Sequence, residues 1–393
     1  MLPNGFRYAG VRANIKKSGL PDLALIVTES PAVAAGVYTQ NIVRATSIDW
    51  NRQITPTTEF RGLVVNSGNA NACTGLQGVR DNETMATELA KKLDVSARQI
   101  GVLSTGVIGR PLPMLQVTNG IELAYESLGD TEAHFERAST AILTTDNGPK
   151  TACSELVLDD RTIRIAAMAK GAGMIGPNMA TMLAMVTTDA RIEPATAQTM
   201  LQNIAHQSFN NISVEGHTST NDALLLICSG TSSANNLAGA ALAQFEEHLT
   251  KICIELAKKI PADGEGATHL IEIHVTGAAS SSDADRIART IANSALFKCA
   301  ITGGDPNWGR IVSAAGCCGV PLNVHEMNLS INGHPLFCDG APITFDAQTV
   351  SESIKGNFET KIELQVGAGP GASRHWTSDL TVAYVKFNSD YTT

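Results

Sequence analysis

The segment KGAGMIGPNMATMLAMVTTDA, from Lys170 to Ala190, constrains the fold of this chain more than any other stretch. Its glycine-rich part lies between two apolar runs, Thr162–Gly171 and Ala180–Ala190, and both runs are typical of buried strands. A connection between two strands differs from the strand-to-helix turn of a dinucleotide-binding unit. Elsewhere, strands and helices occur without strict βαβ alternation, so the sequence predicts an α+β fold built of packed layers.

Hydrophobic periodicity predicts the further elements of these layers. Expected strands are Leu23–Ser30, Gly62–Gly68, Asp222–Gly230 and Ala267–Gly277, and expected helices are Asp81–Val95, Pro194–Phe209 and Gly239–Ile260. A chain of 393 residues is long enough for two or three domains or sub-domains. The polar run Ser280–Asp285 precedes an amphipathic helical pattern, so we expect a smaller C-terminal α/β sub-domain at about 280–393.

Charge and composition argue against several classes of protein. The formal net charge of −9 and the lack of any basic run argue against a nucleic-acid partner, because phosphate binding needs clustered Lys and Arg. No stretch approaches about 18 uninterrupted apolar residues, and no secretory signal is recognisable, so we expect a cytoplasmic protein without a membrane span. The eight cysteines form no CxxC pair and the histidines show no HxxxH spacing, which predicts no metal site.

Residue chemistry alone leaves three interpretations of the glycine-rich segment open. GAGMIG, with Gly171, Gly173 and Gly176, satisfies the G-x-G-x-x-G pattern of nucleotide-binding loops, although a strand is expected to follow it. The second interpretation is structural, with glycines for a crossover and then a core strand. The third is self-cleavage, in which the Thr181 hydroxyl attacks the carbonyl carbon of Ala180 and an oxyanion site stabilises the intermediate.

Self-cleavage would leave Thr181 at a new N-terminus with a free α-amine. An unperturbed α-amine has a pKa of about 8, so it can act near neutral pH as the base for its own hydroxyl. This chemistry fits the absence of a histidine near Thr181 in the sequence. It also fits the small side chain of Ala180 and the upstream glycines, which permit a bent backbone.

A set of motifs along the whole chain resembles one known family. The motifs are NSGNANACTG (Asn66–Gly75), LSTGVIGRPLPM (Leu103–Met114), TTD (Thr144–Asp146), MAKGAGMIGPNMATML (Met168–Leu183), STND (Ser219–Asp222), DGEGATHL (Asp263–Leu270), GGDPNWGRI (Gly303–Ile311) and WTSDLTVAYVKFNSDYTT (Trp376–Thr393). Together they closely resemble the ornithine acetyltransferase (glutamate N-acetyltransferase) family of arginine biosynthesis. The resemblance covers essentially the full length of the chain.

The resemblance implies an autoprocessed acyltransferase with an αββα four-layer sandwich. Family precursors cut themselves before the threonine of ATML, so residues 1–180 would form the N-terminal chain and residues 181–393 the C-terminal chain. The two pieces are expected to assemble as an α2β2 heterotetramer. The implied reaction moves acetyl from N2-acetylornithine to glutamate by a ping-pong route. No cofactor is implied, but some members also use acetyl-CoA, which makes it a candidate co-substrate here.

The resemblance also implies roles for individual residues. Thr181 is the expected nucleophile, with its own amine as the base, and cleavage is expected between Ala180 and Thr181. Thr105 and Gly106 match the oxyanion hole, through a side-chain hydroxyl and a backbone N–H. The expected substrate-binding residues are Thr144, Lys170, Thr181, Glu265, Asn388 and Thr393. Lys170 suits a substrate carboxylate and Glu265 suits a substrate ammonium.

Several positions depart from the family pattern, and two other functions stay open. Glu215 and His217 stand where aspartate is common, Ser378 where cysteine is usual, and Thr392 where arginine is common. One alternative function is an autoprocessed threonine aminopeptidase or amidase of similar fold, with water as the acceptor. The other is an uncleaved nucleotide-binding protein that uses GAGMIG. We interpret NSGNANACTG as a loop near the site and GDPNWGR as a structural turn.

Overall fold

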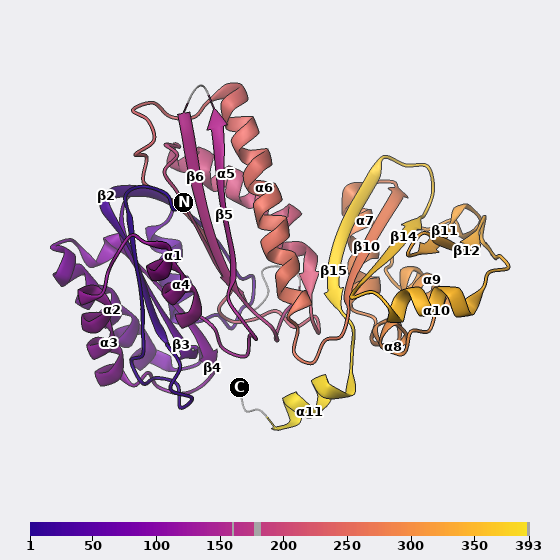
Figure 1. Cartoon of the computed structure of the whole chain (residues 1–393), viewed down its shortest axis with the longest axis horizontal. Coiled ribbons are helices and arrows are strands. Elements are labelled where there is room, and N and C mark those ends of the chain that lie inside the picture. Colours follow the sequence, from indigo (N-terminus) through magenta and orange to yellow (C-terminus); the bar gives the residue numbers. More distant parts are fainter. Residues whose placement is uncertain (159–160, 177–181, 391–393) are drawn as a thin grey trace.

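Two mixed β-sheets, each packed against helices, form the structure (Figure 1). The structure is a computed structural model that describes residues 1–158, 161–176 and 182–390. The predicted α+β class is confirmed, because helices and the strands of two mixed sheets occur in the described chain without strict alternation. Among the described helices, none combines the length and the apolar character that crossing a membrane requires.

The first sheet folds back over itself. Its eight strands within the described residues follow the order β4-β3-β2-β9-β7-β6-β5, with β1 paired to β2. They are β1 (Phe6–Val11), β2 (Leu23–Tyr38), β3 (Thr57–Asn69), β4 (Ile100–Val107), β5 (Lys150–Leu158), β6 (Arg161–Lys170), β7 (Leu183–Thr188) and β9 (Ala223–Cys228). Residues 23–27 of β2 pair with β3, and residues 33–38 pair with β9, so this one strand belongs to both halves of the sheet.

An inner core separates the two halves, and helices cover their outer faces. In the inner core, Leu63 and Leu103 of one half pack with Met168, Met185 and Leu225 of the other. The helices of the sandwich are α1 (Thr46–Ile54), α2 (Gly75–Leu93), α3 (Met114–Glu126), α4 (Glu132–Ala141), α5 (Pro194–Gln207) and α6 (Gly239–Ala262). Of these, α4 packs Phe135 and Ala138 into the inner core. Helices α2 and α3 cover the β1–β4 half, and α5 and α6 cover the β6, β7 and β9 half. This arrangement confirms the αββα sandwich.

The second sheet forms a smaller α/β unit toward the C-terminus (Figure 1). In the described part of the chain its order is β13-β12-β11-β14-β10-β15-β8. The strands are β8 (Ile212–Ser213), β10 (Leu270–Ala278), β11 (Asn328–Ile331), β12 (His334–Cys338), β13 (Ala341–Pro342), β14 (Glu359–Gln365) and β15 (Gly371–Ser378). The helices of this unit are α7 (Ser281–Ala292), α8 (Ala295–Gly303), α9 (Trp308–Gly316) and α10 (Ala347–Lys355). The chain then turns into α11 (Val382–Asp390), which extends back toward the sandwich (Figure 1).

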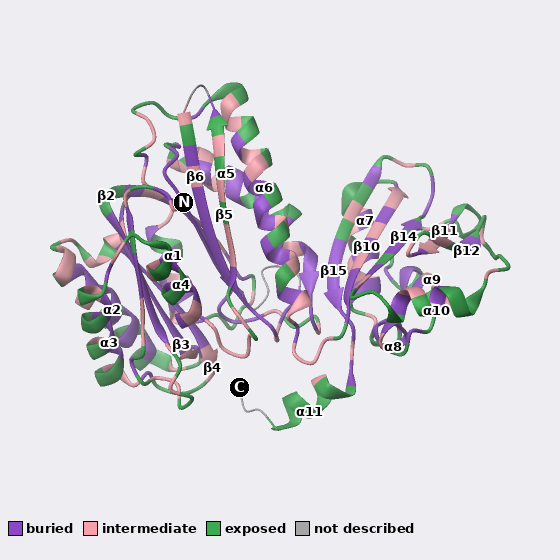
Figure 2. Ribbon diagram, viewed as in Figure 1, coloured by how far each residue is buried: buried purple, intermediate pink, exposed green. Residues whose placement is uncertain are grey.

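The strands that flank the glycine-rich segment, β6 and β7, are deeply buried, and Figure 2 shows this for most of β6. Every residue of β7 and β9 is buried, and the two strands pair in parallel, which explains their continuous apolar sequences. Strand β6 pairs with β7 in antiparallel register, from Ile165 opposite Thr188 to Lys170 opposite Leu183. No helix begins between β6 and β7 in the residues described there, so the dinucleotide-binding interpretation of GAGMIG lacks its helix.

The GDPNWGR block has a local structural role. The Asn307 side chain accepts a hydrogen bond from the Arg310 backbone N–H and so caps α9. The ring of Trp308 stacks on Phe337 of β12 at a centroid distance of 5.1 Å. The amphipathic pattern after Ser280 is divided between α7 and α8, because Ser294 starts a new helix by accepting from the Phe297 N–H.

Candidate functional site

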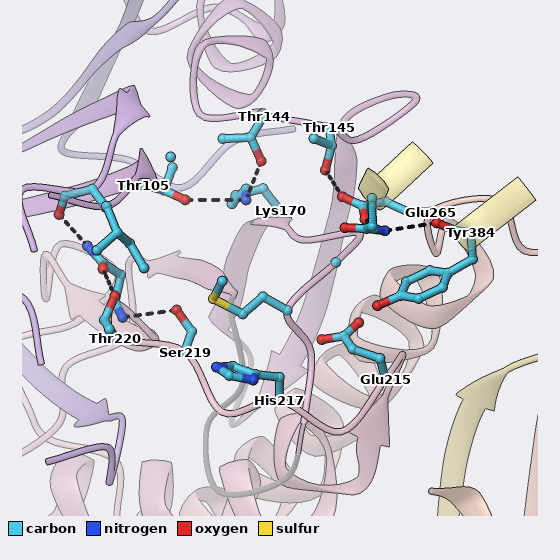
Figure 3. Close-up of a pocket in the computed structure, with 17 residues that line it drawn as sticks. Thr105, Thr144, Thr145, Lys170, Glu215, His217, Ser219, Thr220, Glu265 and Tyr384 are labelled. Carbon is cyan, nitrogen blue, oxygen red and sulfur yellow. Dashed lines mark hydrogen bonds between the residues drawn. The ribbon is translucent and has the colours of Figure 1, made fainter. Parts of the chain in front are cut away.

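A pocket of ≈ 200 Å³ brings together seven segments that are far apart in the sequence (Figure 3). The segments are the β3–α2 loop, the end of β4, the α4–β5 loop, the end of β6 with the glycine-rich segment, the β8–β9 loop, the α6–β10 loop and α11. Six of the predicted site residues line it, namely Thr105, Gly106, Thr144, Lys170, Glu265 and Asn388. The other three, Ala180, Thr181 and Thr393, lie outside the described residues.

Thr105 and Gly106 lie near the end of β4, where the pairing with β3 becomes irregular. Gly106 has a φ of 132°, and a Cβ there would lie 2.4 Å from the carbonyl carbon of Gly68, so only glycine fits. The Thr105 hydroxyl accepts a hydrogen bond from Lys170 Nζ at 3.4 Å. Its own proton therefore stays available to a group in the pocket.

Lys170, the last residue of β6, is a buried cation with an exposed fraction of 2%. Its Nζ donates to the Thr144 hydroxyl at 2.8 Å and lies 3.9 Å from Asp146 Oδ2. Burial lowers the pKa of Lys170 below its ordinary value, and the Asp146 carboxylate acts in the opposite direction. A buried ammonium of this kind can bind a substrate carboxylate, or stabilise developing negative charge, more strongly than an exposed one.

Asp146 links Lys170 to a second buried lysine. Its Oδ1 accepts from Lys150 Nζ at 2.7 Å and from the Gly171 backbone N–H at 2.6 Å, and Lys150 also contacts Asp263 Oδ2 at 2.6 Å. Burial opposes ionisation of Asp146, but the ammonium groups of Lys170 and Lys150 hold the pKa of this carboxyl well below its usual range. The network therefore fixes both Lys170 and the start of the glycine-rich segment.

Replacing Asp146 by asparagine is expected to lower the free energy of unfolding by roughly 3–5 kcal/mol, because two buried ammonium groups lose their shared carboxylate. The stabilisation from Asp146 is present above its ordinary pKa of 3.8 and is lost as pH falls below that value. The stability difference between wild type and Asp146→Asn should therefore narrow below about pH 4. Urea unfolding at several pH values measures it.

Asp263→Asn is the matched control for this experiment, since Asp263 is more exposed and contacts only Lys150 of the two lysines. It should cost about 1 kcal/mol or less. A stability difference for Asp146→Asn that stays constant from pH 7 into the acid range would contradict the assigned role of the carboxylate.

The carboxylate of Glu265 lies beside Gly173 of the glycine-rich segment. Oε1 accepts from the Thr145 hydroxyl at 2.7 Å, and Oε2 accepts from Asn388 Nδ2 at 2.9 Å. The Glu265 backbone N–H donates to the Ala172 carbonyl at 2.9 Å. A Cβ on Gly173 would lie 2.5 Å from this carboxylate, so the glycine leaves the space that Glu265 occupies. Asn388 thereby ties α11 to the pocket.

Both backbone groups of Met182, the residue that follows Thr181, make hydrogen bonds. Its N–H donates to Asp222 Oδ1 at 3.0 Å, and its carbonyl accepts from the Ala223 N–H at 3.1 Å. Burial raises the pKa of Asp222 well above its ordinary value. These contacts anchor the beginning of β7 on the buried start of β9, so the chain next to the expected cleavage point has a fixed position.

Sequence reasoning missed several residues that the structure places in or beside the pocket. Asp146, Asp222 and Tyr384 belong to motifs that carried the resemblance, but none had an assigned role. Glu215 was noticed only as a departure from the family pattern, and it lines the pocket. The signal that could have identified Asp146, Asp222 and Tyr384 was their position within TTD, STND and the C-terminal motif. Ala70, from the NSGNANACTG loop, also lines the pocket, and its carbonyl accepts from Asn221 Nδ2 at 2.7 Å.

Known proteins are similar in sequence to this chain along nearly its whole length. The ArgJ family model matches residues 7–393. The arginine biosynthesis bifunctional protein ArgJ of Rhodopirellula baltica is 50% identical over 396 residues, which cover 100% of this chain and 97% of that protein. The arginine biosynthesis bifunctional protein ArgJ 1 of Nostoc sp. is 44% identical over 402 residues, with coverages of 100% and 97%.

A solved structure is also similar to this chain. The crystal structure of the arginine biosynthesis bifunctional protein ArgJ from Bacillus halodurans superposes with a TM-score of 0.52 at 38% sequence identity. The match covers 53% of this chain and 98% of that one.

Proposed function

The chain belongs to the ArgJ family, and on this premise we propose that it transfers acetyl from N2-acetylornithine to glutamate in arginine biosynthesis. The observation that carries the proposal is a single pocket lined by the buried ammonium of Lys170, the carboxylate of Glu265 and the Thr105–Gly106 pair. An amino-acid substrate carries both an ammonium or amide nitrogen and a carboxylate, so it finds a partner of each sign here. The products are ornithine and N-acetylglutamate.

The reaction follows from the roles of these groups. The Thr181 hydroxyl attacks the acetyl carbonyl of N2-acetylornithine, and the Thr181 α-amine takes the hydroxyl proton. The Thr105 hydroxyl and the Gly106 N–H donate to the oxyanion of the tetrahedral intermediate. Ornithine leaves with the proton that the α-amine had taken. The neutral amine of glutamate then attacks the acetyl-threonine ester, the bond from the acetyl carbon to the Thr181 oxygen breaks, and the proton lost by the glutamate nitrogen returns through the α-amine to this oxygen. Lys170 is a cation in the pocket lining, so it would favour the neutral form of an amine that binds beside it.

Self-cleavage between Ala180 and Thr181, giving pieces of 180 and 213 residues, is part of the proposal. The two pieces would remain associated because β6 of the first piece stays paired with β7 of the second, and β2 stays paired with β9. Buried apolar residues from both sides of the cut also pack in the same two core clusters of the sandwich. We further propose that two such pairs assemble as an α2β2 heterotetramer and that Thr393 contributes to substrate binding.

The bifunctional names of the relatives support acetyl-CoA as a second acetyl donor. Acetyl-CoA would acetylate Thr181 in place of N2-acetylornithine, and glutamate would accept the same acetyl group. Incubation of the enzyme with acetyl-CoA and glutamate alone separates the cases, because N-acetylglutamate forms only if this donor is used.

Release of ornithine from N2-acetylornithine should depend on glutamate. Without glutamate, we expect a burst of about one ornithine per active site and one acetyl group on the C-terminal piece, since the acetyl-enzyme has no acceptor. Adding glutamate should convert the burst into continuous turnover with equal amounts of ornithine and N-acetylglutamate. Chromatography of the amino acids and mass spectrometry of the protein measure both results. Continuous ornithine release that glutamate does not change would instead favour the aminopeptidase or amidase function.

A further inference from the structure

Glu215 presents a buried carboxyl group to the pocket, and the proposed reaction has not used it. It follows β8, and the backbone N–H groups of Val214 and Gly216 on either side both donate to the Ile175 carbonyl at 2.9 Å. Neither carboxyl oxygen of Glu215 has a hydrogen-bond partner among the described residues, although both oxygens are buried. Figure 3 shows the side chain directed into the pocket, toward Tyr384. Since buried polar groups are normally paired, the arrangement points to a ligand as the missing partner.

The surroundings of Glu215 bring its pKa close to neutral pH, so both the carboxylate and the carboxylic acid are accessible there. Burial raises its pKa to about 8. The backbone N–H groups of Ile175 and of Glu215 itself and the ammonium of Lys298 in α8 oppose this shift, and the Glu265 carboxylate adds to it. The Lys298 ammonium donates to the Val214 carbonyl rather than to Glu215, and burial lowers its pKa. Tyr384 of α11 keeps its proton, because burial raises its pKa to about 12, and His217 is a further titratable group in this wall.

The two substrates of the proposed function set opposite demands on one pocket. The side chain of N2-acetylornithine ends in an ammonium, whereas the side chain of glutamate ends in a carboxylate. In a ping-pong reaction both side chains visit the same site in turn. A carboxylate that stayed ionised would bind the first and repel the second, and a permanent cation would do the reverse.

We propose that Glu215 contacts both substrate side chains and changes its protonation between the two half-reactions. As a carboxylate it accepts a hydrogen bond from the δ-ammonium of N2-acetylornithine, and as a carboxylic acid it donates one to the γ-carboxylate of glutamate. When glutamate replaces ornithine, Glu215 takes up one proton from solvent, and it returns this proton to solvent when N2-acetylornithine binds again. This inference rests on the proposed function and names the residue that lets one site accept both substrates.

Glu215→Gln separates the two half-reactions, because the amide resembles the neutral acid and lacks the negative charge. We expect kcat/KM for acetylation by N2-acetylornithine to fall about tenfold or more, the loss typical of a hydrogen bond to a charged group. In the same variant, kcat/KM for removal of the acetyl group by glutamate should change by less than about threefold. In wild type, KM for glutamate should rise as pH increases above about 8, and in Glu215→Gln this rise should disappear.

Two controls keep the test decisive. Glu215→Asp retains a titratable carboxyl group and should retain both half-reactions, which separates loss of charge from loss of folding. Calorimetry of wild type at pH 8 in two buffers of different ionisation enthalpy needs no variant. Because the α-amines of the two ligands ionise alike, glutamate binding should take up more protons, net of any that the amine releases, than ornithine binding does. Equal effects of Glu215→Gln on both half-reactions, or equal proton exchange for the two ligands, would overturn the proposal. If wild type is not acetylated by N2-acetylornithine at all, the proposed function has failed instead.

Discussion

Thr181→Ala is expected to yield a single uncut chain of 393 residues without acetyltransferase activity. The substitution removes the hydroxyl that attacks the Ala180 carbonyl, and it also removes the group that would carry the acetyl intermediate. Loss of a catalytic nucleophile typically costs at least about 10⁴-fold in kcat. Intact mass spectrometry of the denatured protein measures the cleavage, and a coupled assay for ornithine measures the activity.

Thr181→Ser is the matched control, because serine keeps a hydroxyl on the same backbone. It should still be cut between residues 180 and 181 and should keep part of the activity. The contacts of Met182 with Asp222 and Ala223 are independent of the residue at 181, so both variants should retain the anchored start of β7. A full-length wild-type chain with full activity would rule out the N-terminal-threonine mechanism.

Thr105→Val should lower kcat by about 10²–10³-fold, the usual effect of losing one oxyanion-hole donor. The geometry gives a specific reason: Lys170 Nζ already donates to Thr105 Oγ1, which leaves the hydroxyl proton to bind the oxyanion. Valine has nearly the same shape as threonine, so the buried site at the end of β4 should keep its packing. Because the interaction is made in the transition state, KM for N2-acetylornithine should change far less than kcat.

Thr105→Ser is the control that keeps the donor, and it should stay within about tenfold of wild type. Since the same hole can serve the self-cleavage step, each preparation should be assayed after measuring its cleaved fraction by mass. Unchanged kcat in fully cleaved Thr105→Val would show that the oxyanion is bound elsewhere. Gly106 is a poorer target, because any Cβ there would collide with the Gly68 backbone.

The fold was largely predictable because its strands and helices carry strong local patterns. The uninterrupted apolar runs of β7 and β9 and the long periodic helix α6 were expected nearly as they occur. Other boundaries were less accurate: β2 extends from Leu23 to Tyr38 and serves two neighbours, which no local pattern shows. The division into residues 1–180 and 181–393, with a sub-domain at about 280–393, stays a prediction.

The sequence by itself determined the chemistry that the site can use: a glycine-rich connection between two strands, a threonine after a small residue, and the motifs that mark the family. Only the tertiary structure decided which carboxyl groups lie in or beside the pocket and which ionisation state their surroundings favour. Asp146, Glu215 and Asp222 are the same kind of group in the sequence, yet two lysines keep the first ionised whereas burial raises the pKa of the other two. The reason is physical, since desolvation and Coulomb interactions depend on neighbours that folding brings together from distant parts of the chain.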